Sequence, residues 1–204
     1  MCENIEERRV KIGEKVPDFE LDTFFTDKKD FGKIKLSDLS NRGYWTILFF
    51  YPADYTFVCP TELADLQGQY DSIKKEGAEV VAISTDTHFV HLAWQTSEKL
   101  ISDIRYPMGA DPTHAVSKIF GVYDEATGLS LRGTFIIDPD GTLAASEINN
   151  FPVGRNADEL LRKLKAFKYV KENPAEVCPA KWETGKKTLS PGKDLVGKVG
   201  DELG

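Results

Sequence analysis

The chain has 204 residues, which is enough for one globular domain with a substantial core and an appended tail. It carries 26 basic and 33 acidic residues, a net charge of −7, so its surface is poorly suited to binding nucleic acid. No apolar run approaches the roughly 20 residues of a membrane-spanning helix, and residues 1–9 lack the apolar core of a secretory signal. We therefore expect a cytoplasmic protein that binds neither nucleic acid nor a membrane.

The first half of the chain is predicted to contain three strands and one long helix. Residues 16–21 alternate apolar and polar side chains and predict an edge strand, and residues 33–39 predict a short strand that passes into a turn. Residues 45–51 are aromatic and β-branched, which indicates a buried strand. Apolar residues at helical spacing follow Cys59, and Gly77 is a natural stop for that helix.

The second half is predicted to alternate strands and helices and then to lose its periodicity. Strands are expected at 78–84, 133–138 and 142–148, and helices after the N-caps Asp86 or Thr87, Asp111 and Asn156. The pattern favours an α/β fold with a mixed central sheet and helices on both faces. We expect a domain over residues 1–170 and an extended arm rich in proline and glycine over 171–204.

Three cysteines, Cys2, Cys59 and Cys178, are too few and too scattered for a disulfide framework or a four-ligand zinc site. In a reducing compartment they are reactive or buried thiols, and Cys2 is expected to be an exposed thiol without a function. Cys59 lies between a buried strand and a helix whose first turn accommodates Pro60. The positive end of the helix dipole stabilises a thiolate there, whereas the alternative is a small buried hydrophobe.

A reactive thiolate at this turn could attack a peroxide if donors steady the developing charge. Thr56 lies three residues before Cys59, and its hydroxyl can donate to the thiolate or to a peroxide oxygen, or it can serve the turn. Pro52 either shapes the turn and shields the thiol or simply ends the strand.

Charged and aromatic candidates come from other parts of the chain. Arg132 precedes the third buried strand and could lie beside the thiol, although a solvated surface arginine is the alternative. Glu62 could pair with Arg132 or Arg155, and Trp94 could pack near the site or belong to the core.

The histidines are candidates for metal binding or for Cys–His catalysis. His88 and His91 are three residues apart, but no spacing of acidic residues completes a ligand set. We therefore expect His88, His91 and His114 to be surface residues or satisfied core residues.

Several motifs together resemble one family, the peroxiredoxins. Pro52-x-x-x-Thr56-x-x-Cys59 matches their active-site signature, and Phe57-Val-Cys-Pro-Thr-Glu62 looks like its typical two-cysteine form. Val177-Cys-Pro179 resembles the motif of the resolving cysteine. The match extends to His91-Leu-Ala-Trp94, Arg132-Gly-Thr-Phe-Ile-Ile-Asp138, Val153-Gly-Arg155 and Cys178-Pro-Ala-Lys-Trp182. The tail at 194–198 is most similar to that of the peroxidase subunits of bacterial alkyl hydroperoxide reductases.

The resemblance implies a thioredoxin-like fold and an antioxidant thiol peroxidase that reduces hydrogen peroxide and organic hydroperoxides. It implies Cys59 as the peroxidatic thiol, a peroxide site completed by Pro52, Thr56 and Arg132, and a supporting charge network of Glu62 and Arg155. Cys178 of the partner subunit would then capture the sulfenic acid as an intersubunit disulfide.

The resemblance also bears on partners. Family members form homodimers, often five in a ring. Independently of the resemblance, an isolated tail that carries Val177 and Trp182 needs a surface to cover, so we expect it to pack on a neighbouring subunit. Thioredoxin or a dedicated flavoprotein disulfide reductase would recycle the disulfide. No metal or haem is expected to be needed, because sulfur carries both electrons.

Two family features linked to peroxide sensitivity are absent. Residues 98–111 hold no Gly-Gly-Leu-Gly segment, and no Tyr-Phe pair follows Cys178. We therefore predict resistance to overoxidation.

Three other functions stay open at this point. A thioredoxin-like disulfide exchanger is disfavoured because the chain has no Cys-x-x-Cys, residue 62 being glutamate. A ring-forming holdase chaperone would use Cys59 only for regulation. A cysteine hydrolase would need a histidine beside Cys59, which the sequence spacing does not supply.

Overall fold

The computed structural model describes residues 9–204, so Cys2 lies outside the described residues. Contacts divide the chain into two compact units, Met1–Ala157 and Asp158–Gly204, and each is described by itself. The helix α5 (Ala157–Glu172) is grouped almost entirely with the arm. The division expected from the sequence, at 170/171, falls near the end of that helix.

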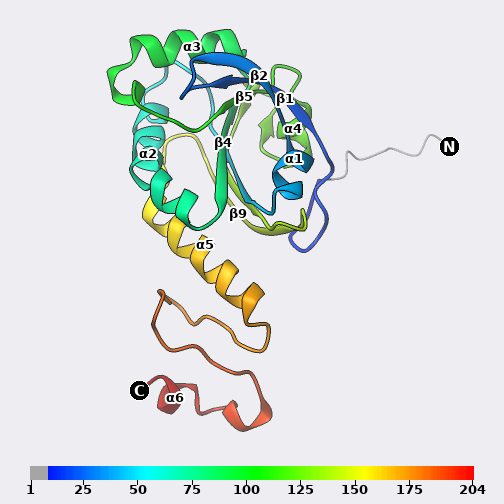
Figure 1. The fold of residues 1–204 in the computed structure, drawn as a ribbon, viewed down its shortest axis with the longest axis vertical. Coiled ribbons are helices and arrows are strands. Elements are labelled where there is room, and N and C mark those ends of the chain that lie inside the picture. The colour runs from blue at the N-terminus through cyan, green and yellow to red at the C-terminus, as the bar shows by residue number, and fades with distance from the viewer. Residues whose placement is uncertain (1–8) are drawn as a thin grey trace, which may run out of the picture. The chain divides into compact units, whose positions relative to one another are not determined.

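The first unit is built on a mixed sheet, as predicted, and this sheet has seven strands (Figure 1). Its order is β2-β1-β5-β4-β3-β8-β9, with β3 parallel to β4, β4 parallel to β5, and every other neighbouring pair antiparallel. The strands are β1 (Glu20–Phe25), β2 (Asp30–Lys35), β3 (Trp45–Phe50), β4 (Ala78–Ser84), β5 (Met108–Ala110), β8 (Arg132–Ile137) and β9 (Leu143–Asn149). A separate ribbon pairs β6 (Tyr123–Asp124) with β7 (Leu129–Ser130).

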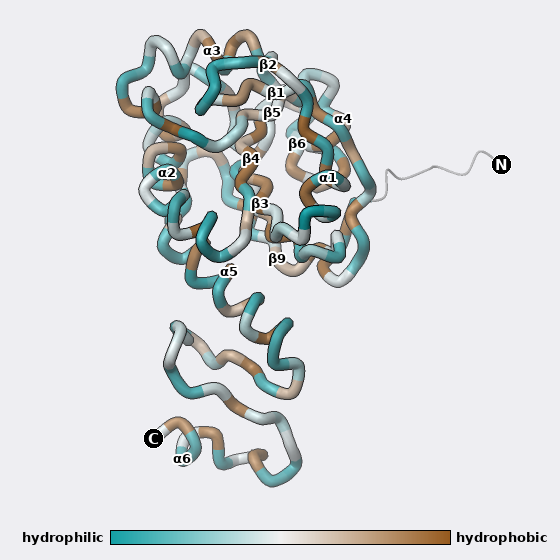
Figure 2. The backbone as a smooth tube through the Cα atoms, viewed as in Figure 1, coloured by the Kyte–Doolittle hydropathy of each residue, from teal (hydrophilic) through white to brown (hydrophobic). Residues whose placement is uncertain are grey.

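The central strands are buried on both faces, which explains their continuous apolar composition. Figure 2 shows β3 and β4 as hydrophobic segments in the middle of the unit. Leu48 and Phe50 of β3 join a core cluster with Leu36 and Leu39 of α1 (Leu36–Asn41) and with Val116 of α4 (Ala115–Ile119). Figure 1 shows α1 and α4 on one face of the sheet and α2 (Cys59–Lys75) on the other.

The β3–α2–β4 connection positions the candidate site. β3 ends at Phe50, the chain turns through residues 51–58, and α2 begins at Cys59. Leu63 and Leu66 of α2 are fully buried, and Gly77, at φ 72°, ends the helix and lets the chain enter β4. The site therefore lies at the carboxyl end of a central strand, where open α/β sheets place their functional loops.

Several predicted boundaries are wrong, and local contacts explain why. The strand predicted at 16–21 lies instead at β1, and the segment 33–39 divides between β2 and α1 because Leu36 and Leu39 are buried at helical spacing. The helix predicted from Asp111 begins at Ala115, because the Asp111 carboxylate accepts hydrogen bonds from the backbone N–H groups of Val116 and Ser117. The helix α3 (His88–Ser97) follows Thr87 as predicted, but without a side-chain cap.

Short elements escaped prediction. β5, β6 and β7 have two or three residues each, too few to show a periodicity, and the 3-10 turn η1 (Lys99–Ile101) also has three.

The second unit holds α5, the 3-10 turn η2 (Lys193–Leu195) and the short helix α6 (Val199–Leu203). An antiparallel bridge joins Val177 to Leu189. Trp182 is only 2% exposed, because its ring lies 4.9 Å from that of Tyr169, and its Nε1 donates to the Lys186 carbonyl. The expectation that Trp182 needs a neighbouring subunit to cover it is therefore wrong, whereas Val177 is 43% exposed.

Candidate active site

Cys59 is the first residue of α2 and is fully buried. Pro60 follows within the first turn, where its missing N–H costs no helical hydrogen bond. The backbone N–H groups at a helix N-terminus carry positive partial charge, so this position favours an anion on the sulfur.

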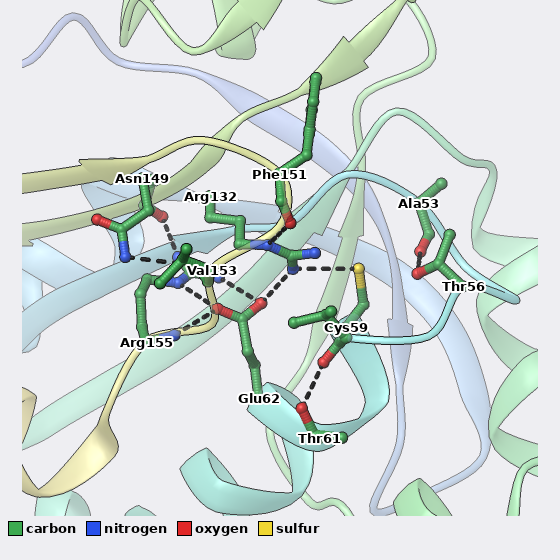
Figure 3. A network of polar contacts seen from close by, with 12 residues as sticks. Ala53, Thr56, Cys59, Thr61, Glu62, Arg132, Asn149, Phe151, Val153 and Arg155 are labelled. Carbon is green, nitrogen blue, oxygen red and sulfur yellow. Dashed lines mark hydrogen bonds and ion pairs between the residues drawn. The ribbon is translucent and has the colours of Figure 1, made fainter.

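Arg132 reaches the sulfur from the first residue of β8 (Figure 3). Its Nη1 lies 3.4 Å from Cys59 Sγ and 2.5 Å from Glu62 Oε2, and its Nε donates to the Phe151 carbonyl at 2.7 Å. The side chain is 4% exposed, so the surface-arginine alternative is wrong. The geometry fixes a guanidinium beside the thiol, where it can stabilise negative charge.

Arg155 binds the same carboxylate from the loop after β9. Its Nε lies 2.8 Å from Glu62 Oε1, and its Nη1 donates to the Gly133 carbonyl and to Thr134 Oγ1. Its guanidinium carbon lies 3.4 Å from the ring centroid of Phe49, a cation–π contact. Burial lowers the pKa of Arg155, and the hydrogen bonds that it donates to Glu62 oppose that effect.

A glycine lets this loop approach the helix. A Cβ added at Gly154 would lie 3.3 Å from Val58 Cγ1 and 3.4 Å from Glu62 Cγ, tighter than most real contacts. The Val153-Gly-Arg155 segment therefore passes directly over the first turn of α2, which places the Arg155 backbone N–H 2.9 Å from Glu62 Oε1.

The charges of this buried cluster do not cancel. Two guanidinium groups, of Arg132 and Arg155, surround one carboxylate, that of Glu62, whose side chain is 2% exposed. Uncompensated charge is costly inside a protein. A thiolate at Cys59 would balance the remaining positive charge, so the cluster is built to hold an anion.

The turn before Cys59 contains the other predicted residues. Pro52 is buried, and Thr56 Oγ1 donates to the Ala53 carbonyl at 2.9 Å (Figure 3). The turn role considered for Thr56 is thus present, and its oxygen keeps lone pairs that can accept from a ligand. Trp94, 1% exposed, lies 6.0 Å from Tyr51 and 6.2 Å from Tyr55 between ring centroids, so it packs against this turn.

Sequence reasoning missed a second polar set beneath the same turn. Tyr51 OH donates to Asp54 Oδ1 at 2.7 Å, and His91 Nδ1 lies 2.8 Å from Asp54 Oδ2. Burial raises the pKa of Asp54, although its hydrogen bond to His91 opposes the effect. His91 is a satisfied core residue, as expected, but no spacing signal links it to a carboxylate 37 positions earlier in the chain.

Cys178 occupies a different environment in the second unit. It is partly buried, and its Sγ donates to the Ala166 carbonyl at 3.9 Å. Burial raises the pKa of this thiol, with Arg162 acting in the opposite direction. Cys178 is therefore kept as a thiol.

The part of the chain that the structure describes shows neither a metal-binding cluster nor a membrane-spanning helix. Over residues 9–204, no group of three or more histidine, cysteine, aspartate or glutamate side chains is placed to hold a metal ion. Within the same range, every helix is too short or too polar to cross a bilayer.

Comparisons with known proteins agree with this geometry. Residues 12–146 match the model of the AhpC/TSA family, and residues 166–200 match that of the C-terminal domain of 1-Cys peroxiredoxin. Alkyl hydroperoxide reductase C of Staphylococcus aureus strain Mu50 is 53% identical over 188 residues, which cover 92% of this chain and 98% of the relative.

Solved structures show the same relationship. Enterococcus faecalis AhpC is 44% identical with a TM-score of 0.79, over 83% of this chain and 99% of that structure. The reduced 2-Cys peroxiredoxin of Plasmodium vivax is 31% identical with a TM-score of 0.85, over 90% and 94%. The predicted thioredoxin-like fold is thereby confirmed. The chain therefore belongs to the AhpC/TSA family and is a peroxiredoxin, a thiol peroxidase that reduces hydroperoxides through cysteine.

Proposed function

We propose that Cys59 is the peroxidatic thiol of this peroxidase and that its substrates are hydrogen peroxide and organic hydroperoxides. The observation that carries the proposal is the contact between Arg132 Nη1 and Cys59 Sγ, within a buried cluster that holds one positive charge in excess. Such a cluster stabilises the thiolate, which is the nucleophilic form of cysteine.

In the first step the thiolate attacks the terminal oxygen of the hydroperoxide. A sulfur–oxygen bond forms as the oxygen–oxygen bond breaks, and the leaving alkoxide takes a proton to become an alcohol, or water from hydrogen peroxide. Sulfur loses two electrons and becomes sulfenic acid. Arg132 is the donor that stabilises the developing charge. Thr56, whose own proton is given to Ala53, accepts the hydroperoxide O–H, and Pro52 excludes water.

In the second step Cys178 of the partner subunit attacks the sulfenic sulfur. A disulfide forms and water leaves, so the two thiols have supplied both electrons. No metal or haem has a role in this scheme. Because Cys59 is fully buried, the first turn of α2 must open before any second sulfur can reach it. Thioredoxin or a flavoprotein disulfide reductase then restores both thiols.

The proposed assembly is a homodimer, with five dimers in a ring. Three large apolar side chains near the Cys59 turn and on α3 are strongly exposed: Tyr55 by 58%, Phe57 by 93% and Phe89 by 62%. Exposed aromatic side chains of this kind favour association between subunits. We place the protein in the cytoplasm, with residues 1–170 as the peroxidase domain and 171–204 as the arm that carries Cys178.

The test is peroxide consumption and non-reducing gel electrophoresis of wild type, Cys59→Ser and Cys178→Ser. Wild type should form a disulfide-linked dimer on addition of peroxide, and both variants should remain monomeric on the gel. Cys59→Ser should consume no peroxide, whereas Cys178→Ser should complete one turnover and stop as sulfenic acid. Full peroxidase activity in Cys59→Ser would contradict the proposal.

Parallel assays separate the other functions. Insulin reduction without peroxide consumption would favour a disulfide exchanger. Suppression of aggregation that survives Cys59→Ser, in a protein that consumes no peroxide, would favour a holdase.

A further inference from the structure

A buried polar chain lies behind the Cys59 turn, separate from the Arg132 cluster. His91 of α3 is fully buried, with Nδ1 2.8 Å from Asp54 Oδ2 and Nε2 3.2 Å from the Gly109 carbonyl of β5. Tyr51 OH donates to Asp54 Oδ1 and lies 3.4 Å from His91 Nδ1. Nothing in the peroxidase chemistry above uses His91 or Asp54.

The contacts fix where the protons must be. A carbonyl oxygen only accepts hydrogen bonds, so His91 Nε2 carries a proton. The short contact between Nδ1 and Asp54 Oδ2 then requires a second proton, carried by one atom or the other, because two lone pairs would repel each other at this distance. The His91–Asp54 pair therefore has no net charge, and its hydrogen bonds leave neither partner as an uncompensated buried charge.

The backbone of the same aspartate belongs to a peptide group of the active-site turn that is held at both ends. The Asp54 backbone N–H donates to Asp86 Oδ2 at 2.9 Å, and Asp86 is itself held by the hydroxyl of Ser84. The other end of that peptide group, the Ala53 carbonyl, accepts the hydroxyl proton of Thr56. The orientation of the Ala53–Asp54 peptide group thus decides where the Thr56 oxygen points.

We propose that His91 and Asp54 are positioning residues for the peroxide site. His91 holds the Asp54 side chain while Asp86 holds the Asp54 backbone N–H, so together they lock the Ala53–Asp54 peptide group. Through this peptide group they aim the Thr56 oxygen at the bound hydroperoxide, three residues from Cys59. Arg132, which Glu62 orients, contacts the Cys59 sulfur through a separate set of hydrogen bonds. The inference rests on the proposed role of Cys59, and it predicts that peroxide reactivity and general thiol reactivity can be separated.

The experiment compares two reactions of Cys59 in the full-length protein, with Cys178→Ser as the common background. One is oxidation by hydrogen peroxide in a single turnover, which needs the aimed Thr56 oxygen. The other is alkylation by iodoacetamide, which needs only an accessible thiolate. The variants are His91→Leu, Asp54→Leu and the conservative Asp54→Asn. His88→Leu, on the same helix, is the matched control.

We expect His91→Leu and Asp54→Leu to lower the oxidation rate by about 10- to 100-fold, the cost of a small misplacement in a catalytic site. Alkylation should stay within about threefold of the parent protein. Asp54→Asn should restore oxidation to within about threefold, because the amide can donate to neutral His91 Nδ1 while its oxygen still accepts from Tyr51. His88→Leu should leave both rates unchanged.

Equal oxidation rates in His91→Leu and the parent protein would overturn the inference. So would an equal decrease in the oxidation rate and the alkylation rate of His91→Leu. If the leucine variants do not fold, Tyr51→Phe removes only one hydroxyl group from the chain and should still slow oxidation selectively. A parent protein that reacts slowly with peroxide would instead overturn the proposed function. The two failures are therefore distinguishable.

Discussion

The two cysteines used by the proposed reaction lie in opposite kinds of environment. Cys59 is fully buried at a helix N-terminus, with a guanidinium 3.4 Å from its sulfur. Cys178 is partly buried in the arm unit, where its sulfur meets a carbonyl oxygen at 3.9 Å and burial raises its pKa. The first environment stabilises an anion and the second a neutral thiol. A peroxidase gains from this asymmetry, because only one sulfur should meet the peroxide first.

The surroundings of the two sulfurs differ as well. Around Cys59 the side chains of Arg132 and Arg155 are buried and both hydrogen-bond to the carboxylate of Glu62. Around Cys178 the arm is held by small local contacts, among them Glu176, whose Oε2 accepts from Tyr169 and from Thr188. These contacts are local and only partly buried, which is typical of a segment that opens at low cost.

The largest effect should come from removing the carboxylate at the centre of the Cys59 cluster. Glu62→Ala leaves Arg132 and Arg155 buried without their anion, and breaking a buried pair in this way costs about 3–5 kcal/mol of unfolding free energy. Urea denaturation measures this cost. Glu176→Ala, in the arm, should shift the midpoint far less. Equal midpoints for the two variants would remove the contrast between the two environments.

Replacing Arg132 should slow the oxidation of Cys59 far more than replacing Arg162. Arg132→Leu removes the donor beside the thiolate, and we expect single-turnover oxidation of Cys59 to fall by about 100-fold or more. Arg162→Leu should leave that step unchanged, because Arg162 pairs with Glu159 and with the Trp182 carbonyl within the arm unit. Stopped-flow measurement of peroxide consumption compares the two variants. A fall of the same size in both would contradict the assignment.

Cys178 offers a smaller, pH-dependent test of the comparison. Because burial raises its pKa in the folded arm, this thiol stabilises the fold below its unfolded-state pKa, and that contribution is lost as the pH rises through the folded-state value. Raising the pH also produces the attacking thiolate. We expect disulfide formation to accelerate by about tenfold per pH unit between about pH 7 and about pH 9. Rapid-quench gels on the sulfenic protein test this, and a flat profile would be inconsistent with a protonated Cys178.

Much of the fold could be predicted from the sequence because the central elements are long and uniformly apolar. The strand at 78–84 matches β4 residue for residue. The helix after Cys59 ends at Lys75, shortly before Gly77, its predicted stop. β5 could not be predicted, because a strand of three residues is too short to show an alternating pattern of apolar and polar side chains. Its place between β1 and β4 depends on tertiary pairing. Strand order is likewise a long-range property.

The residues of the candidate site also divide into those that the sequence predicts and those that it does not. Cys59, Pro52 and Thr56 lie in one local motif, so the sequence predicts them together. The sequence predicts Arg132 from its place before a strand and Arg155 as an alternative partner of Glu62, and only the structure shows that both reach this one carboxylate. The His91–Asp54 pair was missed because its partners come from different elements and are ordinary residue types. Buried hydrogen-bond partners across a fold have no sequence spacing to reveal them.

The smallest expected effect is overoxidation of Cys59, which depends on how quickly Cys178 reaches the oxidised sulfur. Sulfenic acid becomes sulfinic acid only if a second peroxide arrives before the first turn of α2 opens and Cys178 attacks. Tyr106 OH binds the Leu63 carbonyl at 2.7 Å, so the segment at 98–111 tethers α2 after its first turn and leaves that turn free of this restraint. The absence of the Gly-Gly-Leu-Gly and Tyr-Phe features removes two further impediments. Mass spectrometry during repeated turnover should therefore show disulfide with very little sulfinic Cys59. Early sulfinic acid would mean that opening, rather than the chemistry of either sulfur, limits this enzyme.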